Sequence, residues 1–451
     1  MSIVIMVGQL ILGLSILIIL HELGHFLAAR AFGIKVDKFY LFFDAWNFSL
    51  FKFNYKGVEY GIGWLPLGGY VKIAGMIDES MDTEQLAGPP QPWEFRSKPA
   101  WQRLIVMLGG VTVNVILGVL IFWVLTLKYG ESYIPNTEIK YGIVSGKLGQ
   151  RIGLKTGDRI TAINGQPVVR YEELTSTKVL LGNTDLTVER GDQTLHVKVP
   201  GNLINDLADM GLEQFISRVP RSKFVVDSIM PKSYAEIAGL KKGDSIVAVN
   251  NVKIVFFDEL QAELKKFENK AVSIEIKRAG VNKLLVTNVN KEGTLGFKDG
   301  SAGIIAKFDL PKEKKVAFGF FGALPVGATK AWGTITDNAK GFGKIFKGEV
   351  KFNKAVQGPV AIASLFGTTI DWVRFWTLVG FLSMVLAFTN LLPIPALDGG
   401  HALFLIIEMI KGKPLSDKFL ERAQIVGFVI LITLMVFVFG NDIVKQFMKK
   451  F

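Results

Sequence analysis

Four long stretches without a charged residue constrain this chain of 451 residues more than any other feature. A transmembrane α-helix needs about 20 consecutive, mostly apolar residues, and each stretch is long enough to supply one. We therefore predict a polytopic α-helical membrane protein with four transmembrane helices. The uncharged stretches are residues 1–20, 104–127, 375–397 and 423–441.

The motif HELGH at residues 21–25 follows directly after the first apolar stretch. On a helix, His21 and His25 lie one turn apart on the same face, where both imidazoles reach one Zn²⁺ ion. Glu22 lies beside them as the general base for a water molecule. Ionisable groups at membrane depth are costly and usually mark a functional site, so a chance HExxH in a soluble helix is the weaker interpretation. The motif and its setting predict a zinc peptidase site inside the bilayer.

A third zinc ligand is expected near the end of the third apolar stretch. Hydrolytic zinc sites usually take three protein ligands, and the chain has no cysteine and only four histidines. His196 lies in an alternating strand pattern and is expected to be structural. The segment NLLPIPALDGGH at residues 390–401 contains two prolines that must interrupt a helix. Asp398 is the preferred third ligand, because an aspartate at the end of an apolar span is hard to explain without a cation, and His401 is the alternative.

An internal repeat lies between the second and third apolar stretches. GLKTGDRITAING at residues 153–165 is echoed by GLKKGDSIVAVNN at residues 239–251, an offset of 86 residues. Both copies resemble the Gly-Asp turn and following strand of bacterial PDZ domains. The resemblance implies two PDZ domains of mixed α/β structure, over residues 128–218 and 219–306, a fold that adds a peptide strand to a sheet edge. A spacer or steric cap without a peptide ligand is the alternative.

The segment between the first and second apolar stretches contains a Gly- and Tyr-rich region. Its alternation over residues 57–75 predicts a β-hairpin with its turn at residues 66–69. Non-helical backbone near a bilayer is tolerated only against protein or water, so we expect a membrane-associated hairpin beside the zinc helix. There it would offer an edge strand to a substrate near Gly69 and Tyr70. An ordinary cytoplasmic hairpin is the alternative.

Basic residues near the ends of the apolar stretches indicate the orientation. Their positions place residues 31–103 and 399–422 on the cytoplasmic side, so the repeat and both termini face the periplasm. Residues 307–370 are rich in lysine and aromatic residues and are expected to rest as an amphipathic segment on the outer membrane surface. A solvated helix pair packed on its neighbours is the alternative. The expected contact is the lipid bilayer, and no nucleic acid is expected.

HELGH in a first span and NxxPxPxLDGG in a third resemble the paired signatures of the site-2 metalloprotease family of intramembrane proteases. The resemblance covers essentially the whole chain, including the two PDZ-like repeats and GPVAIA at residues 358–363. It implies an intramembrane zinc metalloendopeptidase of the bacterial inner membrane. Zinc would be held by His21, His25 and Asp398, with Glu22 as the general base.

The same resemblance implies residues that contact the substrate. Asn390 is placed to hydrogen-bond substrate backbone or the developing oxyanion, and Gly69, Tyr70 and Pro395 are further substrate-binding candidates. The expected substrates are single-pass membrane proteins already trimmed outside the membrane, of the anti-sigma factor type in an envelope stress response, or remnant signal peptides. GGVTVN, which ends at Asn114, is similar to a small-residue run of the family but has Val-Thr where Pro-Ala is commoner. The role of Asn114 is therefore left open.

Two functions from other classes compete with this interpretation. A metal transporter would also place histidines and carboxylates in spans, but it predicts inverted repeats and ligands spread over several helices. A catalytically inactive PDZ scaffold is disfavoured by the intact motifs. The predicted partition is a first span 1–30, a cytoplasmic loop 31–103, a second span 104–127, PDZ domains 128–218 and 219–306, a basic periplasmic segment 307–370, a third span 371–398, a cytoplasmic loop 399–422, and a fourth span with the C-terminal tail 423–451.

Overall fold

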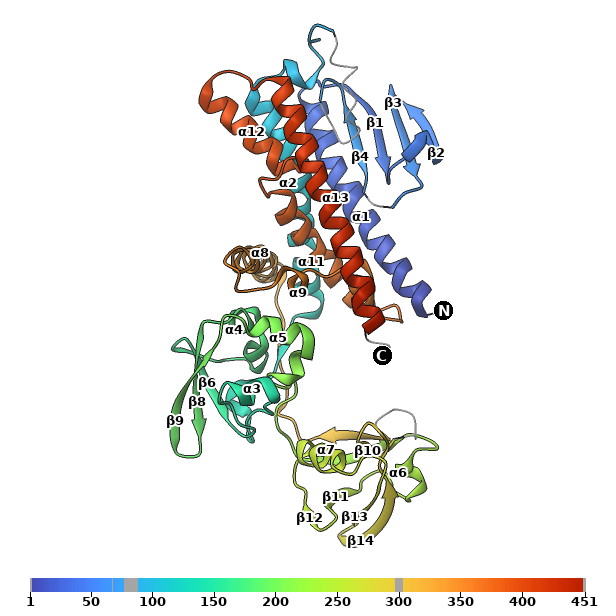
Figure 1. Ribbon diagram of the computed structural model, residues 1–451, viewed down its shortest axis with the longest axis vertical. Coiled ribbons are helices and arrows are strands. Elements are labelled where there is room, and N and C mark those ends of the chain that lie inside the picture. The colour runs from blue at the N-terminus through green and yellow to red at the C-terminus, as the bar shows by residue number, and fades with distance from the viewer. Residues whose placement is uncertain (1, 67, 77–87, 297–302, 449–451) are drawn as a thin grey trace. The chain divides into compact units, whose positions relative to one another are not determined.

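The computed structural model describes residues 2–66, 68–76, 88–296 and 303–448 (Figure 1). The chain forms two compact units, which we name the membrane unit and the repeat unit. The membrane unit comprises Met1–Glu131 and Val316–Phe451, and the repeat unit comprises Ser132–Lys315. Four helices of the membrane unit are long and apolar enough to cross a bilayer, which confirms the prediction of four spans. They are Ile3–Ala31, Ala100–Tyr129, Trp372–Asn390 and Lys418–Asp442.

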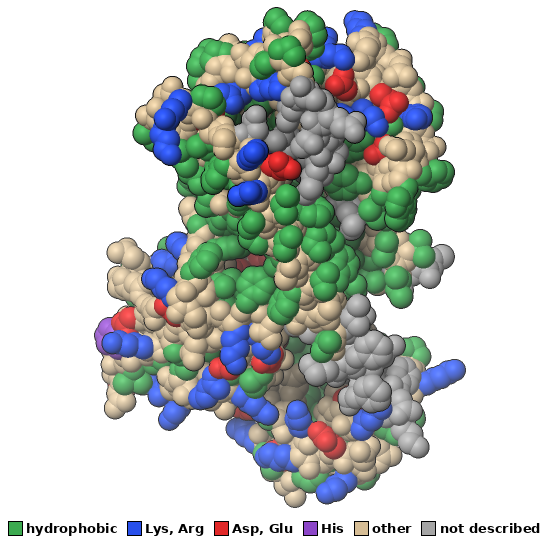
Figure 2. All heavy atoms as spheres, turned by 45° about the horizontal axis from the view of Figure 1, so that its top comes forward, with side chains coloured by type: hydrophobic (Ala, Val, Ile, Leu, Met, Phe, Trp, Pro, Cys, Tyr) green, Lys and Arg blue, Asp and Glu red, His purple; other side chains and the backbone are tan. Residues whose placement is uncertain are grey.

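Helix α2 is the centre of the membrane unit and packs against α1, α8, α11 and α12. The α1–α2 crossing is close because Gly24 and Gly109 face each other, and a Cβ on either would overlap the backbone of the other. Hydrophobic side chains gather on the outside of the helical region, as expected for a surface that faces lipid (Figure 2). The helices are α1 Ser2–Ala31, α2 Ala100–Tyr129, α8 Phe320–Phe346, α9 Phe352–Ala355, α10 Pro359–Phe366, α11 Trp372–Asn390, α12 Asp398–Lys411 and α13 Asp417–Met448.

A four-stranded sheet lies beside α1 (Figure 1). Its strands are β1 Val36–Leu41, β2 Ser49–Tyr55, β3 Val58–Gly63 and β4 Tyr70–Ile73, in the order β2-β3-β1-β4. β1 runs parallel to β3 and antiparallel to β4. β4 is therefore an edge strand, and one apolar cluster joins this sheet to α1, α2 and α12.

The predicted hairpin over residues 57–75 is wrong. β3 and β4 do not pair, because β1 lies between them, with β3 on one side of β1 and β4 on the other. The tight hairpin is instead β2–β3, which turns at Lys56 and Gly57 with φ of 47° and 78°. Local alternation identified two of the strands but could not reveal the earlier strand that separates them. Leu67 of the predicted turn lies outside the described residues.

The predicted break in the third span is confirmed, since α11 ends at Asn390 and helix resumes only at Asp398. The following segment, predicted as a loop over residues 399–422, is instead mostly helical, with α12 ending at Gly412 in the left-handed conformation. Gly399 and Gly400 allow this helix to start directly against the backbone of residues 391–395, where a Cβ would collide. Ala402 and Leu405 are buried, so they lie on the side of α12 that packs against the rest of the membrane unit.

The repeat unit contains two similar sheets with separate apolar cores. Their strand orders match, β7-β6-β8-β9 in the first and β12-β11-β13-β14 in the second, so the sequence repeat corresponds to a repeat in structure. β10 and β15 form an additional antiparallel pair in the second half, so the second repeat extends through Phe308. The elements of the first half are α3 Lys147–Arg151, β6 Arg159–Ile163, β7 Gln166–Pro167, α4 Thr177–Leu180, β8 Thr184–Arg190, β9 Gln193–Val199 and α5 Leu203–Met210. Those of the second half are β10 Phe224–Ile229, α6 Tyr234–Ile237, β11 Ser245–Val249, β12 Val252–Lys253, α7 Phe257–Lys265, β13 Ala271–Arg278, β14 Val281–Asn288 and β15 Ile304–Phe308. β5 Glu131–Tyr133 and β16 Lys314–Val316 lie where the chain passes between the units.

Candidate metal centre

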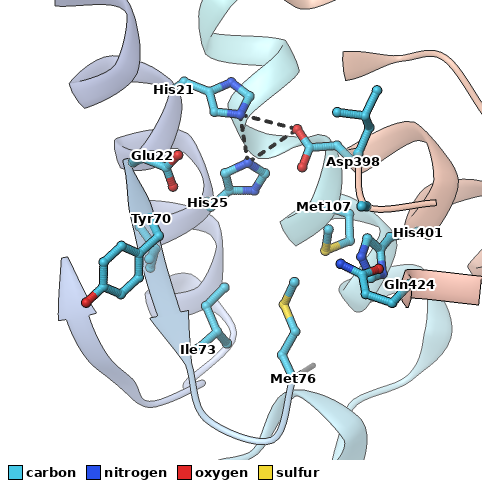
Figure 3. A pocket seen from close by; sticks show the side chains of 13 residues that line it. His21, Glu22, His25, Tyr70, Ile73, Met76, Met107, Asp398, His401 and Gln424 are labelled. Carbon is cyan, nitrogen blue, oxygen red and sulfur yellow. Dashed lines mark hydrogen bonds and ion pairs between the residues drawn. The ribbon is translucent and has the colours of Figure 1, made fainter. Parts of the chain in front are cut away.

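The structure brings His21, His25 and Asp398 together, from the end of α1 and the first residue of α12 (Figure 3). The two Nε2 atoms lie 3.3 Å apart. Oδ2 of Asp398 lies 3.3 Å from Nε2 of His21 and 3.4 Å from Nε2 of His25. Three donor atoms from two helices thus form a nearly equilateral triangle.

The triangle has the dimensions of a zinc site. Tetrahedral zinc with bonds of about 2.0–2.1 Å separates its ligand atoms by about 3.3–3.4 Å. Oδ2 of Asp398 is buried and has no hydrogen-bond partner in the described part of the chain, although it lies beside two imidazoles. A buried carboxylate oxygen without a donor is costly, and a cation at the centre of the triangle removes that cost. Within the described ranges, this is the one cluster of three His, Asp or Glu residues with a metal-ligand arrangement.

Helix α2 holds the outer nitrogen of each imidazole. Nδ1 of His25 lies 2.8 Å from the carbonyl oxygen of Val106, and Nδ1 of His21 lies 3.0 Å from the side-chain amide of Asn114. Gly110 lies between these positions, and a Cβ there would overlap both rings. Sequence patterns gave no indication of Val106, because its contribution is a backbone atom. The adjacent glycines at 109 and 110 were the only signal that α2 approaches the motif so closely.

Glu22 lines a cavity of about 70 Å³ next to the triangle. One water needs about 10–15 Å³ on this measure, so the cavity has room for several water molecules. Gly69 lies against Glu22, since a Cβ there would stand 3.5 Å from the Glu22 Cγ. Tyr70 also lines the cavity, but its hydroxyl points away and donates to Oδ1 of Asp44 at 2.9 Å (Figure 3).

The remaining predicted residues are placed differently. Nδ2 of Asn390 lies 3.1 Å from Nε2 of His21, so this side chain reaches the centre of the site. Pro395 is not among the cavity-lining residues and instead packs against Gly427 of α13. His401 lines the cavity beside Gln424 of α13 but is not part of the triangle (Figure 3). His196 belongs to the repeat unit, where Nδ1 lies 2.7 Å from Oδ2 of Asp185.

Comparisons with known proteins agree with this site. The model of peptidase family M50 matches residues 9–434. A protein of Xylella fastidiosa named "Putative zinc metalloprotease" is 31% identical, over 96% of this chain and 97% of the relative. The "Regulator of sigma-E protease RseP" of Escherichia coli K12 is 29% identical over 96% and 97%, and the "Regulator of sigma E protease" of Haemophilus influenzae is 27% identical over 97% and 98%.

A HExxH helix and a carboxylate donor within a bundle of membrane-spanning helices define an intramembrane zinc metalloprotease of the site-2 type. The family match and the relatives extend over nearly the whole chain. The chain belongs to peptidase family M50, and zinc is the metal of its catalytic site.

Proposed function

We propose that His21, His25 and Asp398 hold the zinc ion and that Glu22 is the general base for peptide-bond hydrolysis inside the membrane. The observation that carries this assignment is the position of Oδ2 of Asp398. This atom is buried with no hydrogen-bond partner among the described residues, and its distances to both imidazoles match those between two ligands of one zinc ion. His401 was the alternative third ligand, and its place outside the triangle supports Asp398.

The chemistry divides between the metal and three side chains. When bound, zinc polarises the scissile carbonyl and lowers the pKa of water toward neutrality. Glu22 takes a proton from the attacking water and later transfers it to the leaving amine. Asn390 has its amide beside Nε2 of His21, from where it donates a hydrogen bond to the substrate carbonyl oxygen as negative charge develops there.

We propose that the substrate is held as an added strand at the edge of β4. A transmembrane helix hides its peptide bonds, so the scissile segment must be unwound, and pairing with an edge strand stabilises the unwound form. Among the described strands, β4 pairs only with β1, and it begins at Tyr70, which lines the cavity. A Cβ on Gly69 would overlap Ile18 and the carbonyl oxygen of Tyr40, so glycine lets the start of β4 lie close against α1 beside Glu22.

We propose single-pass membrane proteins, trimmed beforehand outside the membrane, as the substrates. The names of the sigma-E protease relatives support an anti-sigma factor type of substrate in a stress response. The bacterial inner membrane is the proposed location, with the termini and the repeat unit in the periplasm and residues 31–103 in the cytoplasm. The distribution of basic residues in the sequence supports this orientation.

We propose that residues 128–218 and 219–306 are PDZ domains that act as a size gate. The matching strand orders and the two GL-x-x-GD motifs support the assignment. A gate excludes substrates with bulky periplasmic domains and needs no peptide-specific pocket. Deleting Ser132–Lys315 should then permit cleavage of an untrimmed substrate. If deletion abolishes cleavage of trimmed and untrimmed substrates alike, the repeat unit recognises substrate instead.

The catalytic proposal is tested with Glu22→Gln in proteoliposomes that contain a trimmed single-pass substrate. The amide keeps the shape of the side chain but cannot accept the proton, so cleavage should fall by about 10²–10⁴-fold. Bound zinc, measured by mass spectrometry of the metal, should not change. His196→Ala is the matched control, because this exposed histidine lies in the repeat unit. Cleavage by Glu22→Gln near the wild-type rate would show that Glu22 is not the base.

A further inference from the structure

One face of α2 contacts both histidines of the HELGH motif. Val106, Gly110 and Asn114 are spaced by four residues and therefore lie along one side of the helix. Val106 and Asn114 each reach the Nδ1 atom of one ring, at 2.8 and 3.0 Å. Gly110 makes room for the two rings between them. Because these three residues recur every four positions, the contacts to both histidines come from a single face of α2.

The proposed zinc coordination determines whether each Nδ1 atom carries a proton, and therefore which hydrogen-bond partner it requires. The Nε2 atoms of both rings face Asp398, so each would use its Nε2 lone pair for the metal. A neutral imidazole that coordinates through Nε2 carries its proton on Nδ1, and this N–H requires an acceptor. The carbonyl oxygen of Val106 is such an acceptor for His25. For His21, the amide of Asn114 occupies the equivalent position.

Asn114 is completely buried, and its Oδ1 has no hydrogen-bond partner in the part of the chain that the structure describes. Its Nδ2 is the atom beside Nδ1 of His21, an arrangement suited to a ring whose Nδ1 carries no proton. Rotation of the amide by half a turn exchanges the two ends and presents Oδ1 to the ring. The proton on Nδ1 and the orientation of the amide are therefore coupled.

We propose that Asn114 is a positioning residue for zinc, whose Oδ1 accepts a hydrogen bond from Nδ1–H of His21. This inference rests on the proposed role of His21 as a ligand. Asn114 thereby selects the tautomer of His21 whose Nε2 carries no proton and is free to bind the metal. The same hydrogen bond fixes the orientation of the imidazole ring. The carbonyl oxygen of Val106 accepts the equivalent hydrogen bond from His25. The acceptor for His21 is a side chain, so mutation can remove it.

The backbone of Asn114 is itself held by a third helix. The hydroxyl of Ser383, on α11, donates to the carbonyl oxygen of Asn114 at 2.7 Å, and both residues are completely buried. α11 also carries Asn390, whose amide reaches His21 from the other side of the ring. Asparagines on two different helices thus lie against His21, Asn114 at Nδ1 and Asn390 at Nε2.

The test compares Asn114→Leu, which removes the acceptor, with Asn114→Asp, which keeps it. Full-length protein in detergent is titrated with a zinc chelator, and zinc affinity is measured together with the cobalt absorption spectrum of the cobalt-substituted protein. The leucine variant should lose affinity by about 10–100-fold, and the aspartate variant should bind at least as tightly as wild type. Thr112→Val is the control, since Thr112 is exposed on the same helix and its hydroxyl bonds only to Leu108.

Two results would overturn the proposal. One is an unchanged zinc affinity and cobalt spectrum in Asn114→Leu. The other is a loss of affinity in Asn114→Asp as large as that in the leucine variant, which would show that shape matters and the acceptor does not. If the leucine variant does not fold, the aspartate variant alone decides. His21→Ala is measured in parallel, because retention of zinc there would refute the proposed ligand set instead.

Discussion

The two units of this chain bury aspartates in contrasting environments. In the repeat unit, Asp158 and Asp244 are 1% and 0% exposed, and each carboxylate has a full set of donors. Each accepts a bidentate pair of hydrogen bonds from an arginine at 2.7 Å, and a further bond from the backbone N–H three residues earlier. The arginines are Arg190 and Arg278. In the membrane unit, Oδ2 of Asp398 has no hydrogen-bond partner among the described residues and faces two imidazole nitrogens.

The difference shows that burial alone does not identify a metal ligand. A buried carboxylate is tolerated when a cation or several donors compensate for its lost hydration. An arginine of the same domain compensates Asp244, and the GD motif recurs because each repeat needs the same internal pair. Asp398 has no arginine or lysine partner among the described residues, and we propose that a zinc ion compensates its charge instead. We expect the largest effect from replacing Asp398 and the smallest from a change in pH.

Replacing Asp398 should abolish catalysis, whereas replacing Asp244 should not. Asp398→Asn removes the charged ligand, so cleavage of a trimmed substrate should fall to the level of the chelated wild-type enzyme. Asp244→Asn leaves the membrane unit intact and should keep the wild-type rate on that substrate. The initial rates of both variants in the same proteoliposome assay make the comparison. Equal loss of activity in both variants would show that the Asp398 carboxylate has no special role in catalysis compared with that of Asp244.

Asp244→Asn should instead destabilise the repeat unit. The amide cannot replace a charge-assisted bidentate pair, and hydrogen bonds to charged groups are each worth about 1.5–3 kcal/mol. We expect the free energy of local unfolding of β11 and β13 to fall by about 2–3 kcal/mol. Hydrogen exchange of the full-length protein, followed peptide by peptide by mass spectrometry, measures this change. Unaltered protection of β11 and β13 would mean that the pair contributes little.

A further buried carboxylate, that of Asp442, should give a smaller effect. Asp442 of α13 is 6% exposed and accepts from the backbone N–H groups of Val360 and Ala361 at the start of α10, at 2.9 and 3.4 Å. Losing such a cap costs about 1 kcal/mol. Asp442→Ala should therefore increase hydrogen exchange of α10 slightly while zinc content stays the same. Loss of zinc in this variant would show that any buried carboxylate of the membrane unit affects the metal.

The smallest effect is expected from pH. Burial acts to raise the pKa of Asp244, but hydrogen bonds from Arg278 and the Lys241 backbone outweigh it, and the pKa lies below its ordinary value. A lowered pKa stabilises the folded state at pH above the unfolded value, about 3.9, and the gain is lost as pH falls further. The advantage of wild type over Asp244→Asn in hydrogen exchange should stay constant above about pH 5 and shrink as the pH falls below about 4. An advantage that grows on acidification would contradict this sign.

Sequence patterns predicted the features that depend on composition or on short motifs. The four spans follow from uncharged length, and the break after Asn390 follows from two prolines that no helix accommodates. His21 and His25 lie together because helical spacing alone places them on one face. That Asp398 would join them from another helix was predicted from its cost in an apolar setting.

Other features depend on partners distant in sequence and could not be predicted in this way. Strand β4 pairs with β1 because both bury apolar residues against α1 and α2, which alternation within residues 57–75 does not reveal. Helix α12 was taken for a loop, because its start depends on how Gly399 and Gly400 pack against the preceding turn. Asn114 lies 93 positions from His21, and only the α1–α2 crossing brings them together.

The central claim is that Asp398, unlike the buried aspartates of the repeat unit, is a zinc ligand. The zinc content of purified Asp398→Asn tests this claim most directly. Wild type, Glu22→Gln, Asp244→Asn and His401→Ala are purified in parallel, and the zinc bound per chain is measured by mass spectrometry. We predict that Asp398→Asn loses its zinc while the other three variants retain the wild-type amount. If Asp398→Asn retains zinc and His401→Ala loses it, the buried carboxylate without a donor is not the third ligand.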